Sequence, residues 1–318
     1  MRIIETALLA PAFLAASMAV ASPAPPAFVG ETPADAPLAG AIHDARTGEA
    51  LAPADVAARI VDAEIVLLGE RHDNPDHHAL QAWAVGIAAA RAPAGGLVLE
   101  MVRRDAGGPL ADARAEDVDA LGEALGWEAS GWPDFAMYAP ILAAALDAGW
   151  TLHAGDAARA LTTALARGEE DALAPAERAR LGLDRPLPEA GRVRMERAIV
   201  DGHCGLLSEA AVPGFALAQR LRDAVLADSL LAAPSPAVLI AGAGHVGAEA
   251  VPFYLAARAP ERAVLSIAFV EAAPDVDEPA DLVARFGTAD APYDIAWFTP
   301  EVARGDVCAD LRARFGGG

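Results

Sequence analysis

The chain has 318 residues, with 24 basic and 45 acidic side chains and a formal net charge of −21 at pH 7. Because 54% of its residues are apolar, it can bury a large core and is not a disordered protein. Every basic residue is an arginine, which excludes Schiff-base lysine chemistry and lysine-bearing phosphate loops. Phosphate binding depends on neutralisation by basic side chains, so we expect no nucleic-acid partner for so acidic a chain.

The first 21 residues have the pattern of an export signal. A short charged start is followed by an apolar stretch and by small residues before Ala21, where we expect cleavage. The apolar run is too short for a membrane span, and a misassigned start codon is the alternative interpretation. Residues 22–40 are rich in proline and predict an extended linker. No lipidation cysteine stands at the cleavage point, so we expect an exported protein of the periplasm or cell envelope.

The chain contains two cysteines, Cys204 and Cys308. In an exported protein such a pair is most simply a disulfide. It would close a long loop, for which the chain-entropy model gives roughly 4–5 kcal/mol of stabilisation. A thiol nucleophile or a metal-binding thiolate is the weaker alternative, because the compartment is oxidising. We therefore expect a structural cross-link.

Short apolar runs alternate along the chain with alanine-rich stretches of helical spacing. The runs at 64–68, 96–99, 150–152, 237–241 and 263–270 predict strands, and the stretches at 79–90, 140–148 and 215–231 predict helices. The alternation predicts an α/β fold with a mostly parallel central sheet flanked by helices. Residues 162–231 show no convincing strand and are dense in charge. They predict a helical insertion, or lid, in a core formed by 41–161 and 232–318.

Polar residues gather where the predicted strands end. Glu70 and His72 follow the first strand, Glu100 the second, His153 the third and His245 the fourth. The carboxyl ends of parallel strands meet at one edge of a sheet, where the functional crevice of such folds lies. We therefore expect Glu70, His72, Glu100 and His245 to share one mouth of the core. A lone histidine after a strand is more often a cap or a packed residue, so His153 receives no separate role.

At these positions the sequence resembles the ChaN-like haem-binding uptake family, which is related to the Tiki/TraB and erythromycin-esterase-like groups. The most specific likeness is the string Leu-Leu-Gly-Glu-Arg-His-Asp-Asn-Pro-Asp-His-His-Ala-Leu-Gln at 67–81. Weaker likeness extends through 97–101, 132–140, 203–207, 218–223, 240–245 and 293–300. The resemblance implies an α/β core with a small helical lid. It also implies a bacterial haem-binding protein that can form a homodimer around haem and serves outer-membrane haem or iron uptake machinery.

The resemblance further implies a haem iron bound by tyrosine, and Tyr138 is the tyrosine placed to reach the crevice. His203, on the helical insertion, is the rival axial ligand, since a phenolate suits ferric iron and an imidazole suits either oxidation state. The haem would lie between the insertion and the strand ends. The expected cofactor-binding residues are thus Glu70, His72, His77, Glu100, Tyr138, His203 and His245.

The residues at the strand ends also suit a hydrolase of the Tiki or esterase type. His72 would act as general base, Glu70 and Glu100 as its partners or as ligands of a divalent metal, and His245 as acid or ligand. The chain has no Gly-x-Ser-x-Gly motif, so a serine nucleophile is disfavoured. The sequence therefore leaves two functions open: haem binding for uptake and metal- or His/Glu-dependent hydrolysis.

Overall fold

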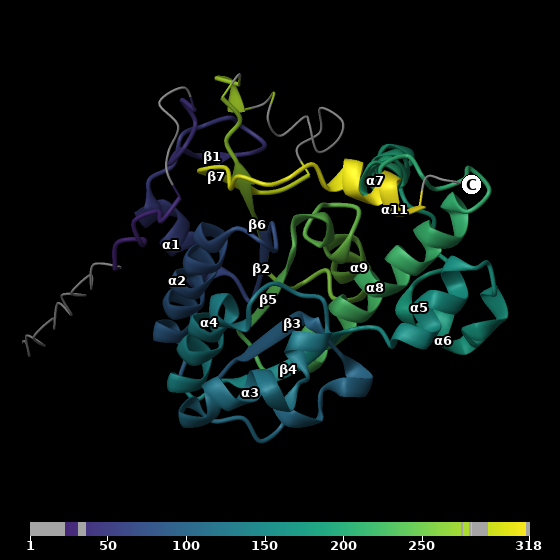
Figure 1. The fold of residues 1–318 in the computed structure, drawn as a ribbon. Coiled ribbons are helices and arrows are strands. Elements are labelled where there is room, and N and C mark those ends of the chain that lie inside the picture. The colour runs from purple at the N-terminus through teal and green to yellow at the C-terminus, as the bar shows by residue number, and fades with distance from the viewer. Residues whose placement is uncertain (1–22, 31–35, 275, 280, 282–291, 316–318) are drawn as a thin grey trace, which may run out of the picture.

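The computed structural model describes residues 23–30, 36–274, 276–279, 281 and 292–315 (Figure 1). The expected export signal, residues 1–21, lies outside these ranges. The expected linker is described at 23–30 and 36–40, and there it lies against the core. The backbone N–H groups of Val29 and Gly30 donate to the carboxylate of Asp76 at 2.6 and 3.1 Å, and Leu38 is buried. These parts of the segment are docked because they carry apolar side chains that the core accepts.

Seven strands form one sheet in the order β1-β7-β6-β2-β5-β3-β4. They are β1 (Ile42–Asp44), β2 (Ile65–Glu70), β3 (Gly96–Arg103), β4 (Thr151–Asp156), β5 (Ala237–Gly242), β6 (Val264–Glu271) and β7 (Ile295–Thr299). β1 runs antiparallel to β7, and the other neighbours are parallel. The α/β fold with a mostly parallel sheet is thus confirmed. The sequence analysis missed β1 and β7, because both are short and stand apart from the strand–helix alternation.

Helices cover both faces of this sheet. They are α1 (Pro53–Asp62), α2 (Pro75–Arg91), α3 (Val118–Ala124), α4 (Phe135–Asp147), α5 (Arg159–Ala166), α6 (Pro175–Leu181), α7 (Glu189–Gly202), α8 (Val212–Ala232), α9 (Val251–Arg258) and α11 (Val307–Phe315). Short 3₁₀ turns are η1 (Arg104–Ala106), η2 (Gly108–Leu110), η3 (Ala115–Asp117), η4 (Trp127–Ala129), η5 (Glu170–Ala172) and η6 (Ala243–His245).

Successive residues of the central strand β2 enter different core clusters. Val66 and Leu68 belong to the cluster that includes residues of α1, α2 and α4, whereas Ile65 and Leu67 belong to the cluster that includes residues of α8 and α9. This is the period of two of an extended strand. Because both faces are covered, β2 reads as an unbroken apolar run, which is typical of parallel sheets.

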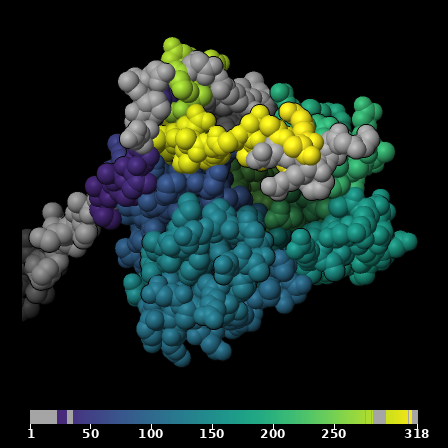
Figure 2. All heavy atoms as spheres, in the orientation of Figure 1, coloured from purple at the N-terminus to yellow at the C-terminus, as the bar shows by residue number. Residues whose placement is uncertain are grey.

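Residues 157–236, between β4 and β5, are helical and contain no strand. The last of these helices, α8, packs directly on the sheet, and Leu221, Leu226 and Leu230 are fully buried there. α8 is therefore a layer of the core as well as the end of the segment expected to form an insertion. Figure 2 shows its green surface set back between the blue-green residues of α3–α4 and the teal residues of α5–α6.

The strands extend further toward their carboxyl ends than the apolar runs suggested. β4 continues to Asp156, so His153 lies in the middle of that strand. Its Nε2 atom is 2.8 Å from the hydroxyl of Thr151. The expectation that His153 follows the strand and reaches its carboxyl edge is therefore wrong, because a strand residue three positions before the end lies about one nanometre from it.

The expected disulfide between Cys204 and Cys308 is present and spans 104 residues of sequence. It joins Cys204, two residues after the end of α7, to Cys308 at the start of α11. The two helices lie side by side in Figure 1. Within the described ranges, no helix has both the length and the apolar character needed to cross a bilayer.

Candidate functional site at the carboxyl edge of the sheet

The strand order brings the predicted polar residues together. β5 lies between β2 and β3, and Glu70 of β2 is in register with Gly242 of β5. His72 Nε2 lies 3.8 Å from Glu100 Oε2, and His245 Nε2 lies 3.2 Å from Glu100 Oε1. All four residues singled out in the sequence therefore share one network at this edge, with Glu100 at its centre.

Glu70 anchors one half of the network. Its Oε1 atom accepts hydrogen bonds from His72 Nδ1 at 2.7 Å and from the Tyr138 hydroxyl at 3.1 Å, and its Oε2 atom lies 2.9 Å from His78 Nδ1. Burial disfavours the carboxylate, but hydrogen bonds from His72 and His78 outweigh it and lower the pKa of Glu70. Burial also disfavours a charged His72, but the hydrogen bond to Glu70 and the charge of Glu100 outweigh it and raise the pKa of His72.

Glu100 anchors the other half. Its carboxylate accepts from Arg222 at 2.7 Å and from the backbone N–H of Gly242 at 2.7 Å. His245 is held on its far side by Asp223, whose Oδ1 lies 2.6 Å from Nδ1. Burial opposes ionisation of Glu100, yet the adjacent cations keep its pKa well below the usual range. Burial also disfavours a charged His245, but the charges of Glu100 and Asp223 prevail and raise its pKa to about 10.

Sequence reasoning missed the residues that α8 contributes. Arg222 Nε donates to Asp156 of β4 at 3.0 Å while its Nη2 donates to Glu100, and Asp223 is fully buried. Burial raises the pKa of Asp223 to about 6, with the charge of His245 acting against it. The adjacent charges Arg222 and Asp223, flanked by apolar residues in a predicted helix, are the signal that could have found them. α8 is thus pinned to three strand ends by ion pairs.

At two of the strand ends the packing is too close for a residue that has a Cβ atom. A Cβ atom on Gly242 would lie 2.8 Å from His72 Nε2, and one on Gly69 would lie 2.4 Å from a methyl group of Val246. The glycines that end the apolar runs in the sequence are therefore needed for the imidazole and the following turn to approach the sheet.

His77 does not take part in this network. Its Nδ1 accepts from the backbone N–H of Arg71 at 2.8 Å and its Nε2 donates to the hydroxyl of Thr299 at 2.8 Å. Burial lowers the pKa of His77 to about 3, so the ring is neutral. Both nitrogens are used inside the core, and the expected role of His77 in cofactor binding is wrong on this geometry. His78, the next residue, is the histidine that reaches Glu70.

None of the three tyrosines presents a free hydroxyl. Tyr138 donates to Glu70, Tyr254 accepts from Arg220 at 3.0 Å, and Tyr293 donates to a backbone carbonyl at 3.4 Å. Burial and the charge of Glu70 raise the pKa of Tyr138 far above its usual value, and burial raises that of Tyr254 to about 12. A phenolate at Tyr138 would place a second anion against Glu70. The structure therefore does not support the expectation that Tyr138 binds the haem iron.

The network opens to solvent at His72. The side chain of His72 is 31% exposed, whereas those of Glu70, Glu100 and His245 are almost fully buried. Its ring lies against the indole of Trp132, with centroids 4.7 Å apart. Within the part of the chain that the structure describes, no group of three or more histidine, cysteine, aspartate or glutamate side chains is arranged to hold a metal ion.

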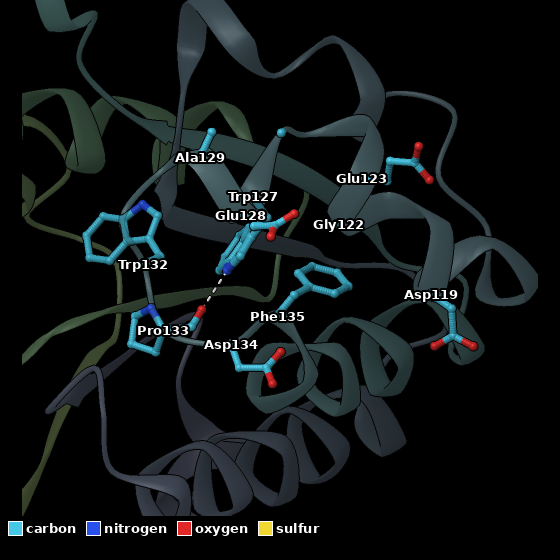
Figure 3. Close-up of a pocket in the computed structure, with 11 residues that line it drawn as sticks. Asp119, Gly122, Glu123, Trp127, Glu128, Ala129, Trp132, Pro133, Asp134 and Phe135 are labelled. Carbon is cyan, nitrogen blue, oxygen red and sulfur yellow. Dashed lines mark hydrogen bonds between the residues drawn. The ribbon is translucent and has the colours of Figure 1, made fainter.

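A hollow of about 830 Å³ lies beside Trp132 (Figure 3). Trp127, Trp132 and Phe135 form its apolar wall, and Trp127 Nε1 donates to the carbonyl of Pro133. The polar lining consists of the carboxylates Asp119, Glu123, Glu128 and Asp134. None of these side chains is a ligand that haem iron takes, and four carboxylates would repel haem propionates.

A second hollow, of about 310 Å³, lies between α7, α8 and the turn after β5. Met195, Ala198 and Ile199 of α7 form its apolar wall, and Gly244 and Gly247 bound it on the side of the sheet. Gln219 of α8 also lines it. The side-chain amide of Gln219 lies 3.2 Å from His245 Nδ1, so the strand-end network stands directly behind this hollow.

His203 lines the second hollow with one ring nitrogen committed. Its Nδ1 atom is 2.7 Å from the carbonyl oxygen of Ile199, and its ring meets Phe215 edge-on at 4.9 Å. A carbonyl oxygen can only accept, so the proton resides on Nδ1 and the lone pair on Nε2. A hydrogen bond from Nδ1 to a backbone carbonyl is the usual support of a histidine that binds a metal through Nε2. His203 therefore has an exposed imidazole whose Nδ1 is fixed by a backbone carbonyl.

Residues 56–255 match the family model described as haem-binding uptake, Tiki superfamily, ChaN. The chain belongs to this family. No match was found among curated proteins.

The structure of cofacial haem binding to ChaN of Campylobacter jejuni matches with a TM-score of 0.61 and 16% identity. The match covers 80% of this chain and 95% of that one, and it shows the shared fold. The type III effector HopBA1 matches with a TM-score of 0.42 and 15% identity over 78% of this chain and 93% of that one. The description of the family names haem binding and uptake. The fold of this chain is that of ChaN.

Proposed function

We propose that this member of the ChaN family is an exported haem-binding protein of haem or iron uptake, and that haem binds in the hollow between α7, α8 and the turn after β5. Family membership supports haem binding, and the pattern of residues 1–21 supports export. The observation that carries the site is His203, an exposed imidazole whose Nδ1 is fixed by the Ile199 carbonyl and whose Nε2 lone pair remains available.

The residues around this hollow fit a haem. Haem supplies an iron that takes an imidazole as axial ligand. His203 would hold the iron, and the apolar side chains of Met195, Ala198 and Ile199 would contact the porphyrin. The hollow is open to the surface, so a haem could enter it from solvent. An uptake protein of the outer membrane is the partner class we propose.

The strand-end network has a supporting role in this proposal. Arg222, Asp223 and Gln219 all lie on α8, the helix that forms one wall of the hollow. Ion pairs from Arg222 to Glu100 and from Asp223 to His245 fix α8 against the sheet. We therefore propose that Glu70, His72, Glu100 and His245 stabilise the wall behind the haem and do not contact it.

The proposal predicts that His203→Ala weakens haem binding by roughly ten-fold or more, because the iron loses its axial ligand, a difference of about 1.4 kcal/mol. Purified mature protein titrated with hemin should show a shifted Soret band, and the variant should show a weaker and differently placed one. His43→Ala is the matched control, since the half-exposed His43 is likewise bonded through Nδ1 to a backbone carbonyl, that of Gly48. Equal Soret titrations for all three proteins would rule out His203 as ligand.

A hydrolase at the strand-end network is the second candidate. One observation favours it: His72 is partly exposed, and its Nδ1 is bonded to the buried carboxylate of Glu70, as in the acid–base imidazoles of many hydrolases. The roles differ from those expected, however. The bond to Glu70 and the charge of Glu100 raise the pKa of His72, which suits a general acid better than a general base.

This candidate predicts measurable cleavage of an activated ester by the wild-type protein. His72→Ala should lower that rate by about 10²–10⁴-fold, as expected for loss of general acid–base catalysis, while hemin affinity stays unchanged. Ester cleavage is followed by release of a chromophore, with His43→Ala as control. Absence of turnover in the wild type, or an equal rate in His72→Ala, would remove hydrolysis at this site.

A further inference from the structure

The disulfide lies next to the residue proposed to hold the haem iron. We propose that Cys204–Cys308 is a site of thiol–disulfide exchange, and that its reduction by a dithiol weakens haem binding in the adjacent hollow. The inference rests on the proposed function, because the group it acts on is His203. It adds to that function a chemical signal that releases the bound haem.

The turn that presents His203 has an unusual backbone. Cys204 follows His203 directly and has a φ of 56°, the one positive φ of a non-glycine residue within the described part of the chain. Its N–H donates to the carbonyl of Asp201 at 2.9 Å, and the N–H of Gly205 donates to that of Val200 at 3.1 Å. This left-handed conformation is unfavourable for an L-residue with a side chain, so neighbouring contacts must hold Cys204 in it.

In addition to the backbone hydrogen bonds of the turn, contacts from α11 hold Cys204. The disulfide joins it to Cys308, and Arg312 Nη2 donates to its carbonyl oxygen at 3.4 Å. Cys204 and Cys308 are 104 residues apart, so without the cross-link α11 is no longer tied to the turn by a covalent bond. The turn can then leave the left-handed conformation. His203 stands one residue away, and the bond of its Nδ1 to Ile199 depends on that turn.

The disulfide can be reached from solvent. Both cysteines are half-buried, and the flanking side chains of Leu206 and Val307 are 41% and 57% exposed. Exposed disulfides at strained positions are those that exchange most readily with thiols. A disulfide whose only task is to staple the core would more commonly be buried within it.

The exchange is a two-electron reaction with a dithiol as reductant. One thiolate of the dithiol attacks a sulfur of the Cys204–Cys308 bond, which breaks and leaves the other cysteine as thiolate, while a mixed disulfide forms. The second thiolate of the dithiol then attacks its own sulfur in the mixed disulfide and releases the remaining protein cysteine. The dithiol leaves as a disulfide, and the protein holds two reduced cysteines.

Haem affinity with and without the cross-link tests the proposal. The full mature chain is titrated with hemin as the oxidised wild type and as the double variant Cys204→Ser/Cys308→Ser, which avoids adding a thiol that could itself bind iron. We expect the double variant to bind hemin at least five-fold more weakly. A second variant, Cys204→Gly/Cys308→Ser, separates the turn from the cross-link, because glycine adopts a positive φ freely. It should bind more tightly than the serine double variant.

Hydrogen exchange distinguishes a failure of this inference from a failure of the proposed function. In the haem-free protein, reduction with a phosphine should increase deuterium uptake of residues 199–206 and leave that of β2 unchanged. If wild type fails to bind hemin but shows this change, the haem site is wrong and the redox-sensitive turn stands. If wild type and the serine variant bind hemin equally, or if uptake at 199–206 does not change on reduction, the redox inference is wrong.

Discussion

Replacing Glu100 by glutamine should lower the free energy of unfolding by about 3–5 kcal/mol, the range measured when one partner of a buried ion pair is removed. Glu100 is buried and accepts from Arg222, from the Gly242 N–H and from His245. Glutamine keeps the shape of the side chain but not its charge. Arg222 and His245 are then left beside a neutral amide in a poorly solvated site, and the remaining carboxylates compensate them only in part.

The measurement is chemical denaturation at pH 7, followed by far-UV circular dichroism. The matched control is Glu189→Gln, which breaks an exposed ion pair with Arg192 and should leave the transition midpoint almost unchanged, since exposed pairs contribute little. A Glu100→Gln variant that unfolds at the same denaturant concentration as wild type would show that the network does not stabilise the fold. The two variants together separate the effect of burial from that of charge removal.

Stability should fall steeply as the pH rises from about 7 to about 9.5. The folded-state pKa of His245, about 10, lies above the ordinary histidine value of 6.5. A group with a raised pKa contributes stability that is complete below its unfolded pKa and is lost as the pH rises toward its folded pKa. Each proton that is bound only in the folded state then gives a slope of about 1.4 kcal/mol per pH unit. The raised pKa of His72 adds loss in the same direction.

Below neutral pH, the two glutamates of the network make stability fall as the pH decreases. The lowered pKa values of Glu70 and Glu100 contribute stability that is present above the ordinary glutamate value of 4.5 and is lost as the pH falls below it. Asp223, with a pKa raised to about 6, contributes stability that is lost between about 3.8 and 6 as the pH rises. We therefore expect maximum stability in the mildly acidic range, below neutral pH.

Thermal unfolding of wild type and His245→Gln between pH 6 and 9.5 measures the alkaline slope. The variant should be less stable at pH 6, because Asp223 loses its buried partner, and should show a shallower decline toward pH 9.5. His203→Gln, a change at an exposed histidine outside the network, should keep the wild-type slope. Parallel curves for wild type and His245→Gln would place the alkaline transition elsewhere.

The convergence of Glu70, His72, Glu100 and His245 could be predicted because it follows from two local features. Each residue follows an apolar run, and parallel strands deliver their carboxyl ends to one edge whatever their order. The expected disulfide followed from a count of cysteines. These inferences needed no knowledge of how distant helices pack.

What such reasoning could not supply was the environment of each group. His77 and His78 are adjacent and equally suited to a site by type, yet one is consumed by Arg71 and Thr299 while the other faces Glu70. Tyr138 is correctly placed near the strand ends but donates its proton inward. Whether a side chain is available to a ligand depends on partners that arrive from other elements, and sequence position does not encode them.

The order of residues along the chain was enough to establish an α/β fold, the edge at which acidic and imidazole groups assemble, and a helical stretch before the last strands. Only the folded structure revealed that α8 closes the network with Arg222 and Asp223, and that His203 lines an open hollow with its Nδ1 fixed by a backbone carbonyl. The physical reason is the distance along the chain over which each property is determined. Hydrophobic periodicity and chain direction are local properties, whereas desolvation, ion pairing and the choice of imidazole tautomer depend on atoms that are brought together by tertiary packing alone.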